Sequence, residues 1–233
     1  MNSLVKLKEV ISERKEFQLE RLILFSDAVF AIAITLLVIE MKVPALKEMT
    51  AHDLKDALIE KIPEFFGFVI SFAVIGQFWI NHHRLFGYVT GYTTNLMWMN
   101  LHMLFWIVLV PFTSGLNSRY GGLDEVWMIY CFNLFMIAMS GYFMARYVNN
   151  PKRNLSAIAN MPEVKKLSYI RSMCIALIFL LGALLCLFNT YLTSRAARII
   201  FLLIPISLSL SNRLVGRTGA GDTSQRETDQ SES

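Results

Sequence analysis

The chain has 233 residues, of which 55% are hydrophobic and only 17% are charged. Soluble domains carry about 25% charged residues, so this composition is typical of a membrane protein. A single soluble globular domain is excluded, because a chain of this length has too little interior to bury so much apolar surface. The net charge of +4 is small and spread over the loops, which argues against nucleic acid as a partner.

The N-terminal segment, residues 1–20, is charged throughout and lacks the apolar core of a cleaved signal peptide. Its charged residues alternate with Val10, Ile11 and Phe17. This pattern predicts a short interfacial or cytoplasmic helix that leads into the membrane.

Six stretches after residue 20 are apolar over the length that a helix needs to cross a bilayer, about 20 residues. Each is predicted to be helical, because lipid offers an irregular backbone no hydrogen-bond partners. Pro111 and Pro205 predict kinks within the third and sixth stretches. The six stretches are Leu22–Val43, Phe65–His82, Leu96–Gly115, Val126–Tyr147, Tyr169–Leu192 and Ala196–Leu210.

Positive charge is distributed unequally between the two sides of this arrangement. With the N-terminus inside, 15 of the 22 Lys and Arg residues lie on the cytoplasmic side and seven on the other. By the positive-inside rule, both termini are expected in the cytoplasm. We therefore expect a six-helix membrane domain over residues 21–211 and a disordered cytoplasmic tail over residues 212–233.

The sequence carries none of the common signatures of catalysis. Cys131, Cys174 and Cys186 lie in apolar stretches, where a thiol behaves as a small hydrophobe. No zinc spacing, phosphate-binding glycine loop or nucleophile elbow is present. We therefore expect no enzymatic activity, no resident metal and no cofactor.

Polar side chains in the inner half of the membrane are the most informative residues, because burying each costs at least about 2.5 kcal/mol. Ser26 and Asp27 lie near the start of the first span, Asp27 about 8 to 9 Å along the helix. The end of the second span and the start of the third reach the same depth, so an interhelical network is predicted. Its expected members are Trp79, Asn81, His82 and Asn100. It can be structural, part of a gate, or a proton relay or metal site.

A helical wheel of the first span shows a narrow stripe on one face. With Ala28 at zero, Ile32, Thr35 and Ile39 lie at about 40°, −20° and 20°. Ser26 and Asp27 lie well away from it, at about 160° and −100°. The stripe suits a pore lining or a helix seam, and plain helix packing with Thr35 bonded to its own backbone is the alternative.

These motifs together resemble a known family. Arg21, Phe25, Ser26 and Asp27 form an RxxxFSD string, and Trp79-xx-His82-His83-Arg84 closes the second span. With the stretch from Asn95 to Pro111, this resembles the transmembrane protein 175 family of potassium channels. The resemblance covers residues 21–113, and the six-span length matches the bacterial members.

The resemblance implies a homotetramer in the bacterial inner membrane, surrounded by lipid, whose first helices line a central pore. It implies pore constrictions at Ile32 and Ile39 and a selectivity layer at Thr35, with a potassium ion near Thr35 as the permeant species. These positions coincide with the stripe of the helical wheel. The expected function is passive, moderately selective potassium conduction, without the carbonyl filter of ordinary potassium channels.

Two other classes of function stay open at this point. A proton-coupled secondary transporter would use Asp27 and His82 as a titrating pair, although the first two spans lack the helix breaks typical of transporters. An intramembrane metalloenzyme would need more converging ligands than Asp27 and His82 supply.

Overall fold

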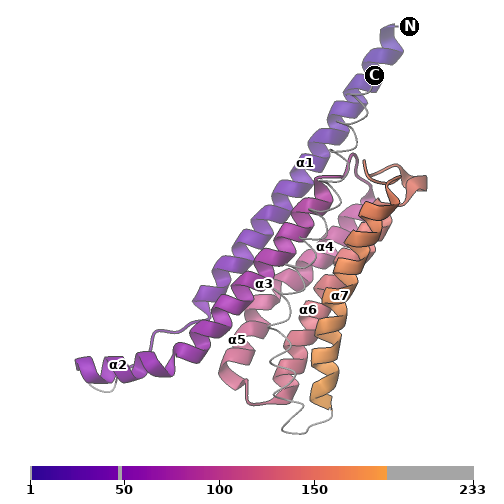
Figure 1. Cartoon of the computed structure of the whole chain (residues 1–233). Helices are drawn as coiled ribbons and strands as arrows, with labels where there is room; N and C mark the ends of the chain where they lie inside the picture. Colours follow the sequence, from indigo (N-terminus) through magenta and orange to yellow (C-terminus); the bar gives the residue numbers. More distant parts are fainter. Residues whose placement is uncertain (1, 47–48, 188–233) are drawn as a thin grey trace, which may run out of the picture.

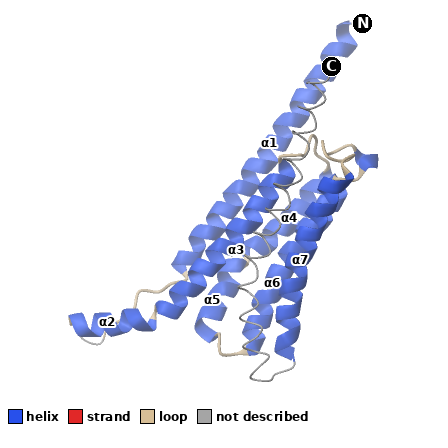
Figure 2. Ribbon diagram, viewed as in Figure 1, coloured by secondary structure: helices blue, strands red, loops and turns tan. Residues whose placement is uncertain are grey.

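The computed structural model describes residues 2–46 and 49–187. Figure 2 shows that this part of the chain is helical apart from its connecting loops, which confirms the predicted all-α class. A turn of 3-10 helix, η1 (Pro151–Arg153), lies in one of these loops. The α-helices are α1 (Asn2–Ile39), α2 (Ala51–Glu60), α3 (Ile62–Phe86), α4 (Thr94–Val108), α5 (Val110–Tyr120), α6 (Asp124–Val148) and α7 (Pro162–Leu187).

Helix α1 is continuous over 38 residues, so the expected short N-terminal helix is not separate from the first span. The segment contains neither Gly nor Pro, and nothing in its sequence interrupts the helical hydrogen bonds. Its end also differs from the prediction, since the helix stops at Ile39 and not at Val43. Pro44 accounts for part of this difference, because a residue before proline disfavours the helical conformation.

Helix α2 was not predicted from the sequence. Thr50 caps its N-terminus by accepting a hydrogen bond at its Oγ1 from the Asp53 amide, 3.2 Å away. None of its residues is buried, and Figure 1 shows it projecting away from the other helices. Its amphipathic pattern lies in a loop that carries too much charge to be read as part of a span.

The third predicted span is divided into α4 and α5 at Leu109, as the kink expected at Pro111 requires. Proline lacks an amide hydrogen, so the carbonyl of Ile107 loses its usual partner one turn later. Thr113 reinforces the start of α5, because its hydroxyl donates to the carbonyls of Leu109 and Val110 at 3.2 Å.

Four helical segments of the described chain are long and apolar enough to cross a membrane, namely Glu13–Ile39, Ile62–Phe86, Thr94–Tyr120 and Asp124–Val148. They correspond to the first four predicted spans. Helix α7 begins seven residues before the predicted fifth span, and its apolar part, Ser172–Cys186, is shorter. The predicted sixth span, Pro205 and the predicted tail lie outside the described residues.

The helices pack into a bundle in which α1 contacts α3, α4 and α5, while α6 lies between α4 and α7. Figure 1 shows α1 extending well beyond the bundle at its N-terminal end. The loops at this end are joined by an isolated bridge between Val89 and Ser156. The bundle core is thus built around α6, and α1 occupies one side of it.

Candidate pore helix and its polar network

Helix α1 has one buried face and one exposed face. The buried positions recur every three or four residues, as a single packed face of an α-helix requires. They hold Leu19, Leu22, Ser26, Phe30, Ala33 and Leu37. Phe30 and Ala33 are each only 1% exposed, so this face fixes the rotation of α1 against the bundle.

The predicted stripe lies at the centre of the opposite, exposed face of α1. The side chains of Ile32 and Ile39 are 57% and 70% exposed, and Thr35 between them is also exposed. Within the described residues, these three side chains do not pack into the core of the subunit. The stripe faces away from the chain's own core and is available to lipid, water or another subunit.

Thr35 adopts the backbone contact that the sequence analysis anticipated. Its hydroxyl donates to the carbonyl oxygen of Ile32 at 2.9 Å. This bond uses the hydroxyl hydrogen and turns the oxygen lone pairs outward, since a hydroxyl has one donor and two acceptor positions. An exposed acceptor thus lies between the two isoleucines.

On the buried face, the predicted polar network is present and links three helices. Asn100 of α4 donates from Nδ2 to the Ser26 hydroxyl of α1 at 2.8 Å. The Nε2 atom of His82, on α3, lies 2.8 Å from the Asn100 Oδ1 atom. Ser26 and Asn100 are fully buried and His82 is 2% exposed, so lipid and water are excluded from all three.

The hydrogen bonds of this network run in one direction. Because the Asn100 amide nitrogen faces Ser26, its oxygen faces His82 and the His82 Nε2 atom carries the hydrogen. Ser26 in turn donates to the carbonyl of Leu22 at 2.8 Å. In the described part of the chain, the His82 Nδ1 atom has no hydrogen-bond partner. The stacked Phe86 ring, 4.4 Å away between centroids, and Phe30 enclose it.

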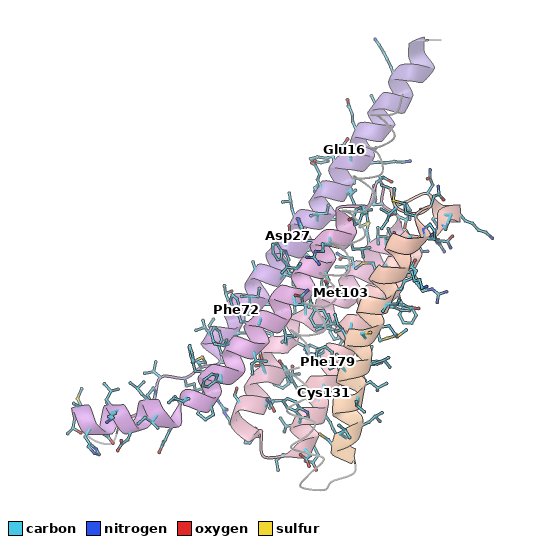
Figure 3. The ribbon with its side chains drawn as sticks, viewed as in Figure 1. Glu16, Asp27, Phe72, Met103, Cys131 and Phe179 are labelled. Atoms are coloured by element: carbon cyan, nitrogen blue, oxygen red, sulfur yellow. The ribbon has the colours of Figure 1, made fainter. Side chains whose placement is uncertain are left out.

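Asp27 lies beside this network and not inside it. Its carboxylate accepts a hydrogen bond from the Trp79 indole at 2.9 Å, and both side chains are partly accessible. Figure 3 shows Asp27 on the side of α1 that faces α3. Asp27 and His82 are thus not hydrogen-bonded to each other, although both contribute to the α1–α3 contact.

Three other predicted residues stand apart from the network. Asn81 bonds to Gln77, one turn earlier on its own helix, at 3.2 Å, so its expected interhelical role is not seen. Arg21 lies over the Phe17 ring at 5.9 Å from its centroid. Phe25 is half exposed. Within the described residues, the hydrogen bonds from the family string to other helices come from Ser26 and Asp27.

Two further polar contacts between helices, the first buried and the second partly exposed, were missed by the sequence analysis. Ser71 of α3 is 2.7 Å from the Ser114 hydroxyl and 2.9 Å from the Tyr130 hydroxyl, which joins α3, α5 and α6. On α4, the His102 Nδ1 atom lies 2.9 Å from the Ser140 hydroxyl of α6. Isolated hydroxyls in apolar spans were the only available signal. The described residues contain no group of three or more His, Cys, Asp or Glu side chains that could hold a metal.

The first helices match a known family model. Residues 21–111 match the model described as the endosomal/lysosomal potassium channel TMEM175. The predicted resemblance is confirmed. The TMEM175-like segment, residues 21–111, contains the membrane part of α1, all of α2, α3 and α4, and the start of α5. Relatives that match this segment are named as channels, which agrees with the expectation of a function other than enzymatic.

Individual proteins show the same likeness. A potassium channel of Streptomyces collinus is 39% identical over 123 residues, which cover 52% of this chain and 59% of the relative. A Gallus gallus protein named endosomal/lysosomal proton channel TMEM175 is 36% identical over 107 residues, 43% of this chain and 21% of that protein. The chain thus matches about half the length of the bacterial relatives.

A solved structure extends the likeness to most of the chain. The crystal structure of a lysosomal potassium-selective channel TMEM175 homolog from Chamaesiphon minutus aligns with a TM-score of 0.70 and 26% identity. The alignment covers 84% of this chain and 98% of that one. The fold therefore agrees beyond the TMEM175-like segment.

Proposed function

We propose that this chain is one subunit of a potassium-preferring cation channel of the bacterial cytoplasmic membrane. In this proposal four copies surround a central pore, each chain contributes six spans, and both termini lie in the cytoplasm. The observation that carries the proposal is the exposed face of α1, where Ile32 and Ile39 flank the Thr35 hydroxyl. The relatives named potassium channels support the choice of ion.

The buried face of α1 explains how such a pore could keep its shape. Ser26, Asn100 and His82 tie α1 to α3 and α4 through fully buried hydrogen bonds. Interhelical bonds of this kind are worth about 0.6 to 2 kcal/mol each in membranes. They would hold the rotation of α1 and thereby keep the Ile32–Thr35–Ile39 face directed toward the axis.

Conduction in this proposal depends on wetting of the neck. Four Ile32 side chains around an axis would form an apolar constriction that excludes water when it is narrow. The outward lone pairs of four Thr35 hydroxyls would replace part of the hydration that a cation loses beside this ring. Single rings of hydroxyls offer few coordinating dipoles, so potassium is expected to be preferred only moderately over sodium.

Protons are the second candidate ion, because the TMEM175-like segment also matches relatives named proton channels. A proton-coupled transporter is less favoured, since Asp27 and His82 are not hydrogen-bonded to each other and α1 is unbroken. A metalloenzyme would show bound metal on analysis of the purified protein.

Reversal potentials of the reconstituted full-length chain test the proposal. Under opposed potassium and sodium gradients at equal pH, the current should reverse between the two equilibrium potentials, on the potassium side of zero. With symmetrical potassium and a pH gradient, the reversal potential should stay near zero. A reversal that follows the pH gradient would identify a proton channel, and strict coupling of cation to proton movement without unitary current steps would identify a transporter.

A further inference from the structure

The N-terminal part of α1 leaves the bundle and carries two exposed apolar side chains. Figure 3 places Glu16 on this projecting segment, beyond the ends of the neighbouring helices. Val10 and Phe17 are 59% and 57% exposed. A helix that stands in water with a bare apolar edge is stabilised when another surface covers that edge.

The bare edge of the projecting segment continues the exposed stripe of the membrane part. On the wheel that places Ala28 at zero, Val10 and Phe17 lie at about 0° and −20°, and Leu24 at about −40°. Ile32, Thr35 and Ile39 lie within about 40° of the same line. The apolar edge of the projecting segment and the exposed stripe of the membrane part therefore lie on the same side of α1.

Charges of opposite sign lie on the two sides of this edge. Among residues 13–21, the acidic residues Glu13, Glu16 and Glu20 all lie between about −60° and −120°. The basic residues Arg14, Lys15 and Arg21 all lie between about 20° and 140°. In the part of the chain that the structure describes, Glu13, Glu16, Arg14 and Lys15 have no ion-pair partner.

This separation fits copies of the same helix arranged in parallel around an axis. In a cyclic ring each subunit presents one side to the next and its other side to the previous one. The acidic side of one projecting helix would then meet the basic side of its neighbour. The spacing supports this, because Glu16 and Arg21 are five residues apart, the spacing of interhelical pairs in parallel bundles.

We propose that the projecting segments of α1, over residues 10–21, associate side by side as a parallel ring, each acidic side on the neighbour's basic side. The inference rests on the proposed cyclic channel assembly and extends it to a contact outside the membrane. Val10 and Phe17 supply only one apolar residue per seven, so the ring depends strongly on the charged contacts. Its stability should fall as salt screens them.

Exchanging the charges on each side of the full-length chain tests this contact. Glu13→Lys with Glu16→Lys gives the acidic side two basic residues beside Glu20, and Arg14→Glu with Lys15→Glu gives the basic side two acidic residues beside Arg21. The quadruple variant restores opposite signs and has the net charge of the wild type. All four positions are exposed, so the fold of the subunit is expected to tolerate the changes.

Oligomer mass is then measured during dilution in mild detergent at low salt. Each double variant should raise about tenfold the protein concentration at which half of the oligomer has dissociated. The quadruple variant should return this concentration close to the wild-type value. In high salt the differences should shrink. Unchanged assembly of both double variants, or a quadruple variant no better than the doubles, would overturn the proposal.

Other outcomes distinguish the proposed ring from lipid binding and from a failure of the channel assembly itself. If basic side chains bound anionic lipid, Arg14→Glu with Lys15→Glu alone would weaken membrane association and the two added lysines would strengthen it. That pattern, with no recovery in the quadruple variant, would overturn the ring.

A wild-type chain that stays monomeric would overturn the channel assembly as well as the ring. A conducting tetramer whose assembly is unchanged by all the charge variants would overturn the ring alone.

Discussion

At the scale of single residues, depth in the membrane was predictable from sequence and rotation was only partly so. Ser26, His82 and Asn100 were identified because a polar side chain in lipid needs a partner, and they bond as expected. Asn81 was assigned to the same network on depth alone. It lies about 100° around α3 from His82 and bonds to Gln77 instead. The Ser71, Ser114 and Tyr130 cluster was missed, because lone hydroxyls can bond to their own helix and give no distinct signal.

Replacing Asn100 by Ala should destabilise the subunit strongly. The change leaves the buried His82 Nε2–H group without its acceptor and removes the donor to Ser26. A buried unsatisfied group costs about 1 to 3 kcal/mol, so thermal unfolding in detergent should occur at clearly lower temperature. Asn95→Ala, at an exposed position of the same helix, is the control. Asp27→Ala should have a smaller effect, because Asp27 is only half buried. Equal melting of the Asn100 and Asn95 variants would contradict a structural role of the network.

The Thr35 hydroxyl is expected to affect ion preference and not stability. Thr35→Ala removes an exposed group bonded only to the Ile32 carbonyl in the described structure. Potassium preference over sodium should fall, as measured by bi-ionic reversal potentials, while oligomer mass stays unchanged. Thr35→Ser keeps the hydroxyl and should retain most of the preference. A serine variant as unselective as the alanine variant would show that the threonine methyl, not its oxygen, matters.

At the scale of elements, span positions followed from hydropathy, whereas helix ends depended on local chemistry. The kink at Pro111 was predicted because a missing amide hydrogen is visible in the sequence. The end of α1 was placed four residues late, at Val43 in place of Ile39, because the apolar residues Met41 and Val43 follow the last helical turn. Helix α2 was missed, because its apolar residues are few and its charges are typical of a loop.

The turn between α5 and α6 provides a matched test of local packing. A Cβ atom on Gly121 would lie 2.4 Å from the Asn117 carbonyl oxygen, which belongs to the backbone. On the adjacent Gly122 it would meet nothing within 4 Å. Gly121→Ala should therefore lower the free energy of unfolding by about 1 to 3 kcal/mol, and Gly122→Ala should change it little. Thermal unfolding of the two variants checks the difference, and equal stability would mean that the turn relaxes easily.

At the scale of the whole molecule, the sequence predicted a membrane protein and its resemblance to a channel family, but a single chain cannot define how copies assemble. The exposed stripe of α1 and the many exposed apolar side chains show which surfaces the subunit leaves uncovered. Four of the six predicted spans are recognisable in the described chain, and the sixth lies outside it. In the proposed channel, lipid and neighbouring subunits share the uncovered surfaces, and hydropathy alone does not distinguish between them.

Assembly into a tetramer is the corresponding prediction. One Ile32, Thr35 and Ile39 face cannot enclose a pore, and the proposed channel needs four. Mass measurement of the protein released from mild detergent should give four times the chain mass of 26.7 kDa. A stable monomer or dimer that conducts ions would contradict the arrangement of α1 helices around one axis.

The central claim is that Ile32 forms the constriction of a pore lined by α1, and single-channel recording of Ile32→Asn tests it most directly. Four amides in place of four apolar side chains should keep the neck wet, so the basal open probability and current should rise. The matched control is Ile70→Asn, which places the same exposed amide on α3. The account predicts increased basal current for Ile32→Asn and wild-type current for Ile70→Asn. Unchanged current in the Ile32 variant, or an equal rise in both, would contradict it.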